Sequence, residues 1–255
     1  FGSPRGQRAL SGLGSWSTSF HWKVPPRSCR GAMCGYSAIG SPQGLVKDVP
    51  HMRFPKLHQF SYFLGGSTFI GGTALFFPEY ANGFWSAVLY TVGSVGFLVV
   101  DILELYAFTL PTRRNSPKAK STLCMVAQSI VSLSGSSFYV AGSLCFLPQI
   151  SHYVFGFLFF LIGSTLIFVS QATKCMNLTW DVDSALKLQK QDATNLLAMA
   201  TEAGAGFGAM FFMIGSTSTY NATGIYAAEF YVGGSLGFFA GSLFLMLRYL
   251  RGEIP

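Results

Sequence analysis

Six long apolar stretches separated by polar segments organise this chain of 255 residues. As helices, each is long enough to cross a hydrocarbon core of about 30 Å at about 1.5 Å per residue. Short polar links between paired stretches are typical of helical hairpins. The pattern therefore predicts an all-α integral membrane protein of six transmembrane helices. We expect these helices near residues 58–77, 85–108, 123–147, 152–170, 195–219 and 226–249.

One short motif recurs in every apolar stretch: an aromatic residue lies three positions before a glycine, which is followed by Ser or Thr. From one pair of stretches to the next, the equivalent glycines are 70 to 73 residues apart. Self-similarity at a fixed period predicts three copies of one helical hairpin. The motif reads Phe69-x-x-Gly72-Thr73, Tyr90-x-x-Gly93-Ser94, Tyr139-x-x-Gly142-Ser143, Phe160-x-x-Gly163-Ser164, Phe212-x-x-Gly215-Ser216 and Tyr231-x-x-Gly234-Ser235.

Glycine has a physical role in membrane helices, because lipid provides no hydrophobic drive for helix association and small residues let backbones approach closely. We expect each motif aromatic to fill a gap in a neighbouring helix, and each Ser to bond across helices or to its own backbone. A notch that lines a substrate path is the alternative function of the Gly-Ser pair. The predicted helix-packing positions are Gly65, Gly72, Gly93, Gly135, Gly142, Gly163, Gly208, Gly215, Gly234 and Gly241.

Two short membrane helices that carry the aromatic-x-x-Gly-Ser motif and are joined by a brief polar turn resemble the YrhK-like domain of membrane proteins. The resemblance covers about residues 60–108, 125–170 and 205–249, and so implies three copies. The first copy departs from the pattern with Thr73 in place of Ser. The family implies no established reaction and no catalytic residue, so the resemblance adds a fold and no activity.

The distribution of charge gives the topology. Only 11% of the residues are charged, against roughly 25% in soluble domains. All 17 Lys and Arg lie in the N-terminal segment, the 109–122 loop, the 171–194 loop or the tail after Leu247. With six crossings these segments share one face, and the positive-inside rule makes it the cytoplasmic or matrix face. Basic flanks of this kind are ordinary in membrane proteins and do not indicate nucleic-acid binding.

The first 56 residues differ from the rest, since they contain eight Lys or Arg, one acid and many Gly, Ser and Pro. An Arg-rich, Ser-rich, acid-poor segment is typical of the region near an organelle-targeting presequence. We expect an extended arm that needs a partner to become ordered. The predicted organisation is an arm at 1–56, hairpin 1 at 57–110, a basic loop at 111–122, hairpin 2 at 123–170, a polar loop at 171–194, and hairpin 3 with a short tail at 195–255.

Acidic residues at membrane depth are the first candidates for chemistry, because a charge there is costly and often functional. Glu202 lies within the fifth stretch and Glu229 near the start of the sixth, so the two could belong to an ion path. The simpler interpretation pairs Glu202, Asp101 and Glu104 with interfacial Lys or Arg and leaves Glu229 among the lipid headgroups. No Lys, Arg or His is expected in mid-helix as a relay partner.

Sequence motifs for catalysis are not found: the chain has no phosphate-binding loop, dinucleotide fingerprint, nucleophile elbow or His-Glu-x-x-His. Its five cysteines lack the close pairs of a zinc or iron–sulfur site, and its histidines offer no facing pair for haem. We therefore expect a protein that is not an enzyme, with no metal and no cofactor.

These observations favour a non-catalytic accessory subunit of a multi-subunit membrane complex, namely a respiratory-chain complex or an ATP synthase in the mitochondrial inner membrane, with both termini on the matrix side. The alternative is a small-solute or ion transporter built from three parallel hairpin repeats; a pigment or quinone protein has only the aromatic abundance in its favour. Expected partners are other subunits and phospholipids, including cardiolipin, and no nucleic acid. Basic residues expected at lipid headgroups are Arg113, Arg114, Lys118, Lys120, Arg248 and Arg251.

Overall fold

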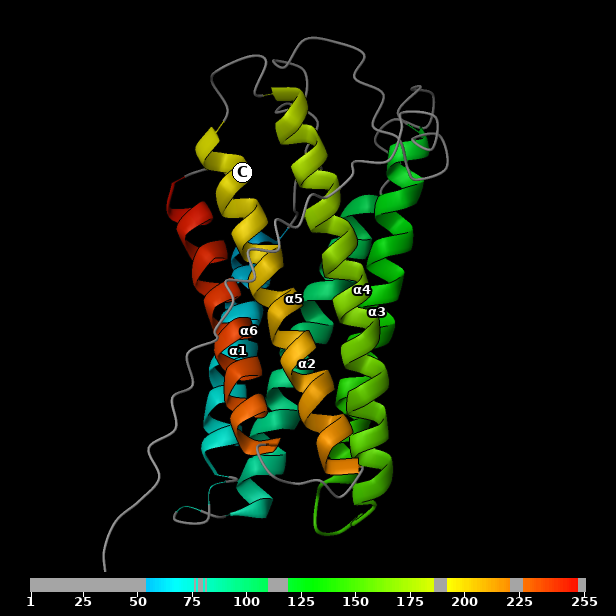
Figure 1. Ribbon diagram of the computed structural model, residues 1–255, viewed down its shortest axis with the longest axis vertical. Coiled ribbons are helices and arrows are strands. Elements are labelled where there is room, and N and C mark those ends of the chain that lie inside the picture. Colours follow the sequence, from blue (N-terminus) through cyan, green and yellow to red (C-terminus); the bar gives the residue numbers. More distant parts are fainter. Residues whose placement is uncertain are drawn as a thin grey trace, which may run out of the picture. The chain divides into compact units, whose positions relative to one another are not determined.

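The computed structural model describes residues 54–75, 77, 80, 82–109, 119–185, 192–220 and 227–251. These residues contain no strand, so the prediction of an all-helical chain is confirmed for the described part (Figure 1). The predicted arm at 1–56 lies outside the described residues up to residue 53, and the predicted basic loop at 111–122 lies outside them up to residue 118; the last four residues of this loop are helical, which the prediction did not include. The helices are α1 (Pro55–Ala74), α2 (Gly83–Thr109), α3 (Ala119–Cys145), α4 (Tyr153–Ala185), α5 (Asp192–Tyr220) and α6 (Ala227–Leu250), all in one compact unit at residues 36–255.

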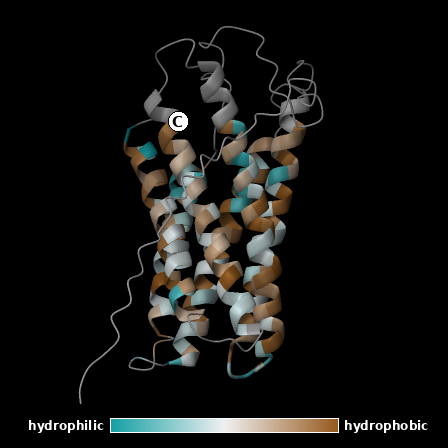
Figure 2. Cartoon of the chain, in the orientation of Figure 1, coloured by the Kyte–Doolittle hydropathy of each residue, from teal (hydrophilic) through white to brown (hydrophobic). Residues whose placement is uncertain are grey.

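Five of the described helices, α2 to α6, are long and apolar enough to cross a membrane. Figure 2 shows that hydrophobic positions predominate along them. Helix α1, the first of the six predicted membrane helices, is not among the five. Its mean hydropathy is reduced by four glycines and by polar residues such as His58 and Gln59. The chain therefore has the helices of a membrane protein.

Sequence features at the helix starts explain two of the boundaries. Pro55 occupies the first turn of α1, where its missing N–H leaves no hydrogen bond unmade. At the start of α2 the side-chain Oδ1 of Asn82 accepts a hydrogen bond from the Trp85 N–H at 3.2 Å, which is the usual action of an N-cap.

The six helices form a closed ring, in which each helix packs on its neighbours in the chain and α1 packs on α6 (Figure 1). Helices α1 and α2 are antiparallel, since Gly72 lies against Tyr90 while Gly96 lies against Ser61. Helices α1 and α6 are also antiparallel, with the Tyr249 hydroxyl 3.4 Å from His58 Nδ1. The start of α1 and the end of α6 therefore lie at the same end of the ring.

Aromatic rings fill the interior of the helix ring. They contact each other between helices that are not neighbours in the chain: the ring centroids of Phe69 and Phe212 are 5.3 Å apart, and those of Tyr139 and Phe238 are 6.2 Å apart. Each helix contributes one ring that is at most 2% exposed. We call these six residues the aromatic layer: Phe69, Tyr90, Tyr139, Phe160, Phe212 and Phe238.

Each aromatic residue of the sequence motif lies on the motif glycine of the helix it is paired with. A Cβ atom at Gly142 would be 2.5 Å from the Phe160 ring, and one at Gly163 would be 2.8 Å from the Tyr139 ring. Real Cβ atoms do not approach so closely, so these positions admit only glycine without a shift of the ring or helix. The other four contacts are Gly72 with Tyr90, Gly93 with Phe69, Gly215 with Tyr231, and Gly234 with Phe212.

Hydroxyl groups next to these glycines form the polar part of the same layer. Within the pair α3–α4, the Tyr139 hydroxyl and Ser164 Oγ are 2.8 Å apart. Between pairs, Ser94 Oγ of α2 lies 2.9 Å from Ser143 Oγ of α3. Further hydroxyl contacts join Thr73 with Tyr90, Thr73 with Ser235, and Ser216 with Tyr231. Because buried hydroxyl groups need hydrogen-bond partners, these bonds fix the register between adjacent helices.

Helix α4 is longer than the apolar stretch at 152–170 that predicts it, and it continues to Ala185. The predicted polar loop at 171–194 is therefore helical at residues 171–185, and again at 192–194, where α5 has begun. Hydropathy falls beyond Ser170 because Gln171 and Lys174 are polar, and both line the interior of the helix ring. These polar residues lower the hydropathy of α4, but the helix continues past them.

Candidate functional site

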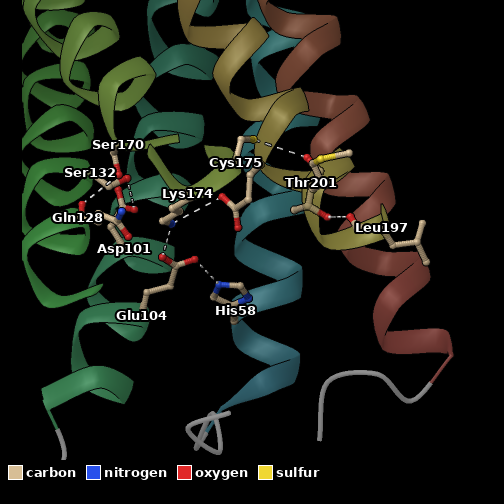
Figure 3. A network of polar contacts seen from close by, with 12 residues as sticks. His58, Asp101, Glu104, Gln128, Ser132, Ser170, Lys174, Cys175, Leu197 and Thr201 are labelled. Carbon is tan, nitrogen blue, oxygen red and sulfur yellow. Dashed lines mark hydrogen bonds and ion pairs between the residues drawn. The ribbon is translucent and has the colours of Figure 1, made fainter. Parts of the chain in front are cut away.

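Charged side chains from four helices meet inside the ring, at the end where α1 begins and α6 ends (Figure 3). Lys174 of α4 lies between two carboxylates: its Nζ is 2.8 Å from Glu104 Oε2 of α2 and 3.7 Å from Glu202 Oε2 of α5. His58 of α1 places Nε2 at 3.5 Å from the other oxygen of Glu104. We call His58, Glu104, Lys174 and Glu202 the charged cluster.

Burial gives the charged cluster its energetic weight. The side chains of Lys174, Glu104 and Glu202 are only 14%, 17% and 19% exposed. A buried charge is tolerated when it is paired and hydrogen-bonded, and breaking such a pair leaves an uncompensated charge in a medium of low dielectric constant. One ammonium group is shared here by two carboxylates, and His58 lies beside one of them.

Beside the cluster, Asp101 of α2 connects α2 to α3. Ser132 Oγ donates a hydrogen bond of 2.7 Å to Asp101 Oδ1. Ser170 of α4 donates to the Gln128 carbonyl oxygen of α3 at 3.0 Å (Figure 3). Among the described residues, no Lys, Arg or His forms an ion pair with Asp101, whose residue is 7% exposed. This carboxyl group is therefore held by hydroxyl donors instead of a cation.

A cavity of about 280 Å³ lies at this end of the ring. Its volume is near the lower limit of small-molecule sites, which run from about 300 to 1,000 Å³. Two aromatic side chains, Phe97 and Phe238, stand among its walls with their ring centroids 4.9 Å apart. Every helix contributes to the lining, with His58 and Tyr62 from α1, Asp101 and Glu104 from α2, Gln128 and Ser132 from α3, Gln171 and Lys174 from α4, Thr201 and Glu202 from α5, and Leu245 and Arg248 from α6.

The two acids predicted for an ion path do not lie together. Glu202 lines the cavity and contacts Lys174, whereas Glu229 is exposed in the first turn of α6, at the other end of that helix from Arg248. The expectation that no cationic residue stands inside a helix is wrong for Lys174, because α4 extends past it. Lys174 is instead the centre of the charged cluster.

The basic residues predicted at lipid headgroups have different surroundings. Arg248 lines the cavity, and Arg251 is exposed just after α6. Lys120 belongs to α3, while Arg113, Arg114 and Lys118 lie outside the described residues. Their contact with cardiolipin stays a prediction. In the described part of the chain, no group of three His, Cys, Asp or Glu side chains is arranged to hold a metal ion.

Sequence reasoning missed most of the cavity lining, although the motif contained a signal for it. Positions eight and eleven residues after the motif glycine Gly93 are Asp101 and Glu104, and the same steps from Gly163 lead to Gln171 and Lys174. A step of eleven residues returns to nearly the same face of a helix, and a step of eight lies about 80° away from it. The face that carries the motif therefore continues as a polar face toward this end of the ring.

Comparison with family models, with curated proteins and with solved structures found no match. The resemblance to the YrhK-like domain therefore stays a prediction that rests on the aromatic and glycine motif. The features of this chain that bear on its function are the ring, the aromatic layer and the charged cavity.

Proposed function

We propose that this chain is a non-catalytic accessory subunit of a multi-subunit membrane complex, either a respiratory-chain complex or an ATP synthase in the mitochondrial inner membrane. The aromatic layer is the observation that carries the proposal. One ring from each of the six helices fills the interior, and rings such as Phe69 and Phe212 meet across it. Because packed side chains fill the interior of the helix ring, the ring suits a role in assembly better than a role in conduction.

The outer surface of the ring fits the same role. Large apolar side chains point away from the interior on several helices, with Phe60 62% exposed, Phe155 56% exposed and Phe207 58% exposed. Exposed apolar side chains on several helices are what lipid or partner helices would cover. In an accessory subunit, the outer face would bridge neighbouring subunits and retain phospholipids, cardiolipin among them.

The proposal treats the ring as three copies of a YrhK-like hairpin, namely α1–α2, α3–α4 and α5–α6. Support comes from the reciprocal contacts between motif aromatics and motif glycines within each pair. Helix α1 crosses the membrane with the others in this view, because it packs along both α2 and α6. Six crossings then put both termini on one side, the matrix side.

A transporter is the second candidate, and the charged cavity is the observation in its favour. Buried acids such as Asp101 and Glu202 line a space of about 280 Å³ that could receive a solute. Transport would also need a route past the aromatic layer. In the accessory subunit the charged cluster holds α1, α2, α4 and α5 together, and no solute has to pass.

Purification of the tagged full-length chain from its native membranes in a mild detergent tests the proposal. We expect it to migrate on a native gel with a defined set of other subunits that mass spectrometry identifies. Gly234→Ile should reduce this assembly through overpacking, while Glu202→Gln should assemble and leave the activity of the complex unchanged. A chain that purifies alone and moves solute into liposomes, with flux abolished by Glu202→Gln, would refute the accessory role.

A further inference from the structure

Acidic side chains gather in the cavity. Asp101, Glu104 and Glu202 line it together with the basic residues His58, Lys174 and Arg248. Lys174 is already engaged by Glu104 at 2.8 Å and by Glu202 at 3.7 Å. Asp101 receives a hydroxyl hydrogen bond but no ion pair within the described residues. Because a buried carboxylate is stabilised by a paired cation, the part of the lining beside Asp101 favours a positively charged ligand.

Two buried glutamines each have one side-chain atom without a hydrogen-bond partner in the described part of the chain. Gln171 lines the cavity at 7% exposure and its Oε1 accepts no hydrogen bond, while Gln128 lines it at 8% exposure and its Nε2 donates none. A buried polar atom without a partner costs about 1–3 kcal/mol, so such atoms usually indicate a bound molecule or water. Gln171 Oε1 in particular is an acceptor available to a ligand N–H.

Aromatic side chains supply the remaining walls. The rings of Tyr62 and Phe97 meet edge to face at 5.7 Å, and Phe97 lies 4.9 Å from Phe238. All three line the cavity. Aromatic faces attract organic cations, and the attraction is strongest where water is excluded. The cavity therefore combines carboxylates, an amide acceptor and aromatic surface.

The geometry points to a binding site for a small organic ammonium ion in this cavity, held by Asp101 and Gln171 against the rings of Phe97 and Phe238. A bare metal ion fits less well, because it would leave apolar walls and most of about 280 Å³ unfilled. An anion is disfavoured by the three acidic side chains of the lining. The site is independent of the proposed accessory role, since it depends only on the interior of the chain.

Calorimetric titration of the purified full-length protein in detergent tests this site with n-butylammonium chloride as the probe. Two matched ligands serve as controls: n-butanol, which has nearly the same shape without the charge, and sodium chloride at equal ionic strength. We expect saturable binding of n-butylammonium and none of n-butanol or sodium. Asp101→Asn keeps the shape of the side chain and should weaken binding by about tenfold or more, because charge-assisted hydrogen bonds are roughly twice as strong as neutral ones.

Two further variants keep the test decisive. Gln171→Met removes the amide acceptor at nearly constant volume and should weaken binding severalfold, which covers the case that Asp101→Asn does not fold. Glu229→Gln removes an exposed acid at the other end of α6 and should leave binding unchanged. Absence of saturable n-butylammonium binding to the wild type would overturn the inference, as would equal binding by Gln171→Met or displacement by inorganic phosphate. Because no partner subunit takes part, this result is separate from the outcome of the native-gel experiment.

Discussion

Two adjacent glycines of α6 provide a sharp test of the packing. A Cβ atom at Gly234 would collide with the Phe212 ring and would lie 3.0 Å from the Gly208 carbonyl oxygen. At Gly233 the nearest atoms belong to the Phe211 ring, at 3.4 Å, which is an ordinary van der Waals contact. Alanine at these two positions adds the same methyl group to the same helix, so the comparison isolates the fit between α5 and α6.

The expected magnitudes follow from two opposing effects. Alanine is preferred over glycine inside a helix by about 0.5–1 kcal/mol, and this gain applies to both positions. Overpacking in a tight interior costs about 1–3 kcal/mol, and it applies to Gly234 alone. We therefore expect Gly233→Ala to leave stability unchanged or slightly higher. Gly234→Ala should be less stable than Gly233→Ala by about 2 kcal/mol in free energy of unfolding.

Equilibrium unfolding of the purified variants, followed by circular dichroism in mixed micelles with increasing sodium dodecyl sulfate, measures this difference. Identical slopes of the transitions would show that the variants unfold over the same surface. If Gly234→Ala is as stable as Gly233→Ala, the Phe212 ring can move without cost. The contact between motif aromatic and motif glycine would then not be what holds α5 against α6.

Other predictions address the charged cluster, the topology and the arm. Lys174→Met leaves two buried carboxylates without their cation and should lower the free energy of unfolding by about 3–5 kcal/mol in the same assay. Adding Glu104→Gln should restore part of that loss. An unchanged unfolding midpoint for Lys174→Met would contradict the buried ion pair. Single cysteines in sealed vesicles should be labelled from opposite sides for Arg114→Cys and Ala222→Cys, and labelling from one side would contradict six crossings. Limited proteolysis should remove residues 1–50 more slowly from the intact complex than from the isolated chain, and equal rates would contradict an arm held by partners.

Much of the described fold could be predicted from the sequence because membrane helices are long apolar segments that a sequence shows directly. Apolar runs predict six helices within a few residues at most ends, since lipid requires continuous apolar length. The glycine motif also predicts contacts, as Gly142 with Phe160 and Gly163 with Tyr139 illustrate. Close backbone approach demands small residues, so the sequence shows where two helices meet even though it does not show which helices they are.

The cavity could not be predicted in the same way. Mean hydropathy averages over all faces of a helix, so Lys174 is assigned to the predicted loop at 171–194. In the structure it is an inward-facing residue of α4. Closure of the ring depends on α1 meeting α6 across the chain, as Thr73 meets Ser235, and no local signal specifies that pairing. Composition also leaves α1 out of the helices that are apolar enough to cross a membrane, since its glycines face neighbouring helices.

The position of Lys174 has a consequence for how the proposed repeat works. Glu104, Lys174 and Leu245 stand eleven residues after the motif glycines of α2, α4 and α6, and all three line the same cavity. In a strict repeat, three equal charges would face each other there, and like charges in a buried site repel strongly. Glycines and aromatics can be alike in each hairpin because they are uncharged, even where rings such as Phe69 and Phe212 meet across the interior. Charged residues that meet their counterparts there have to differ, and an acid, a base and an apolar residue satisfy that requirement.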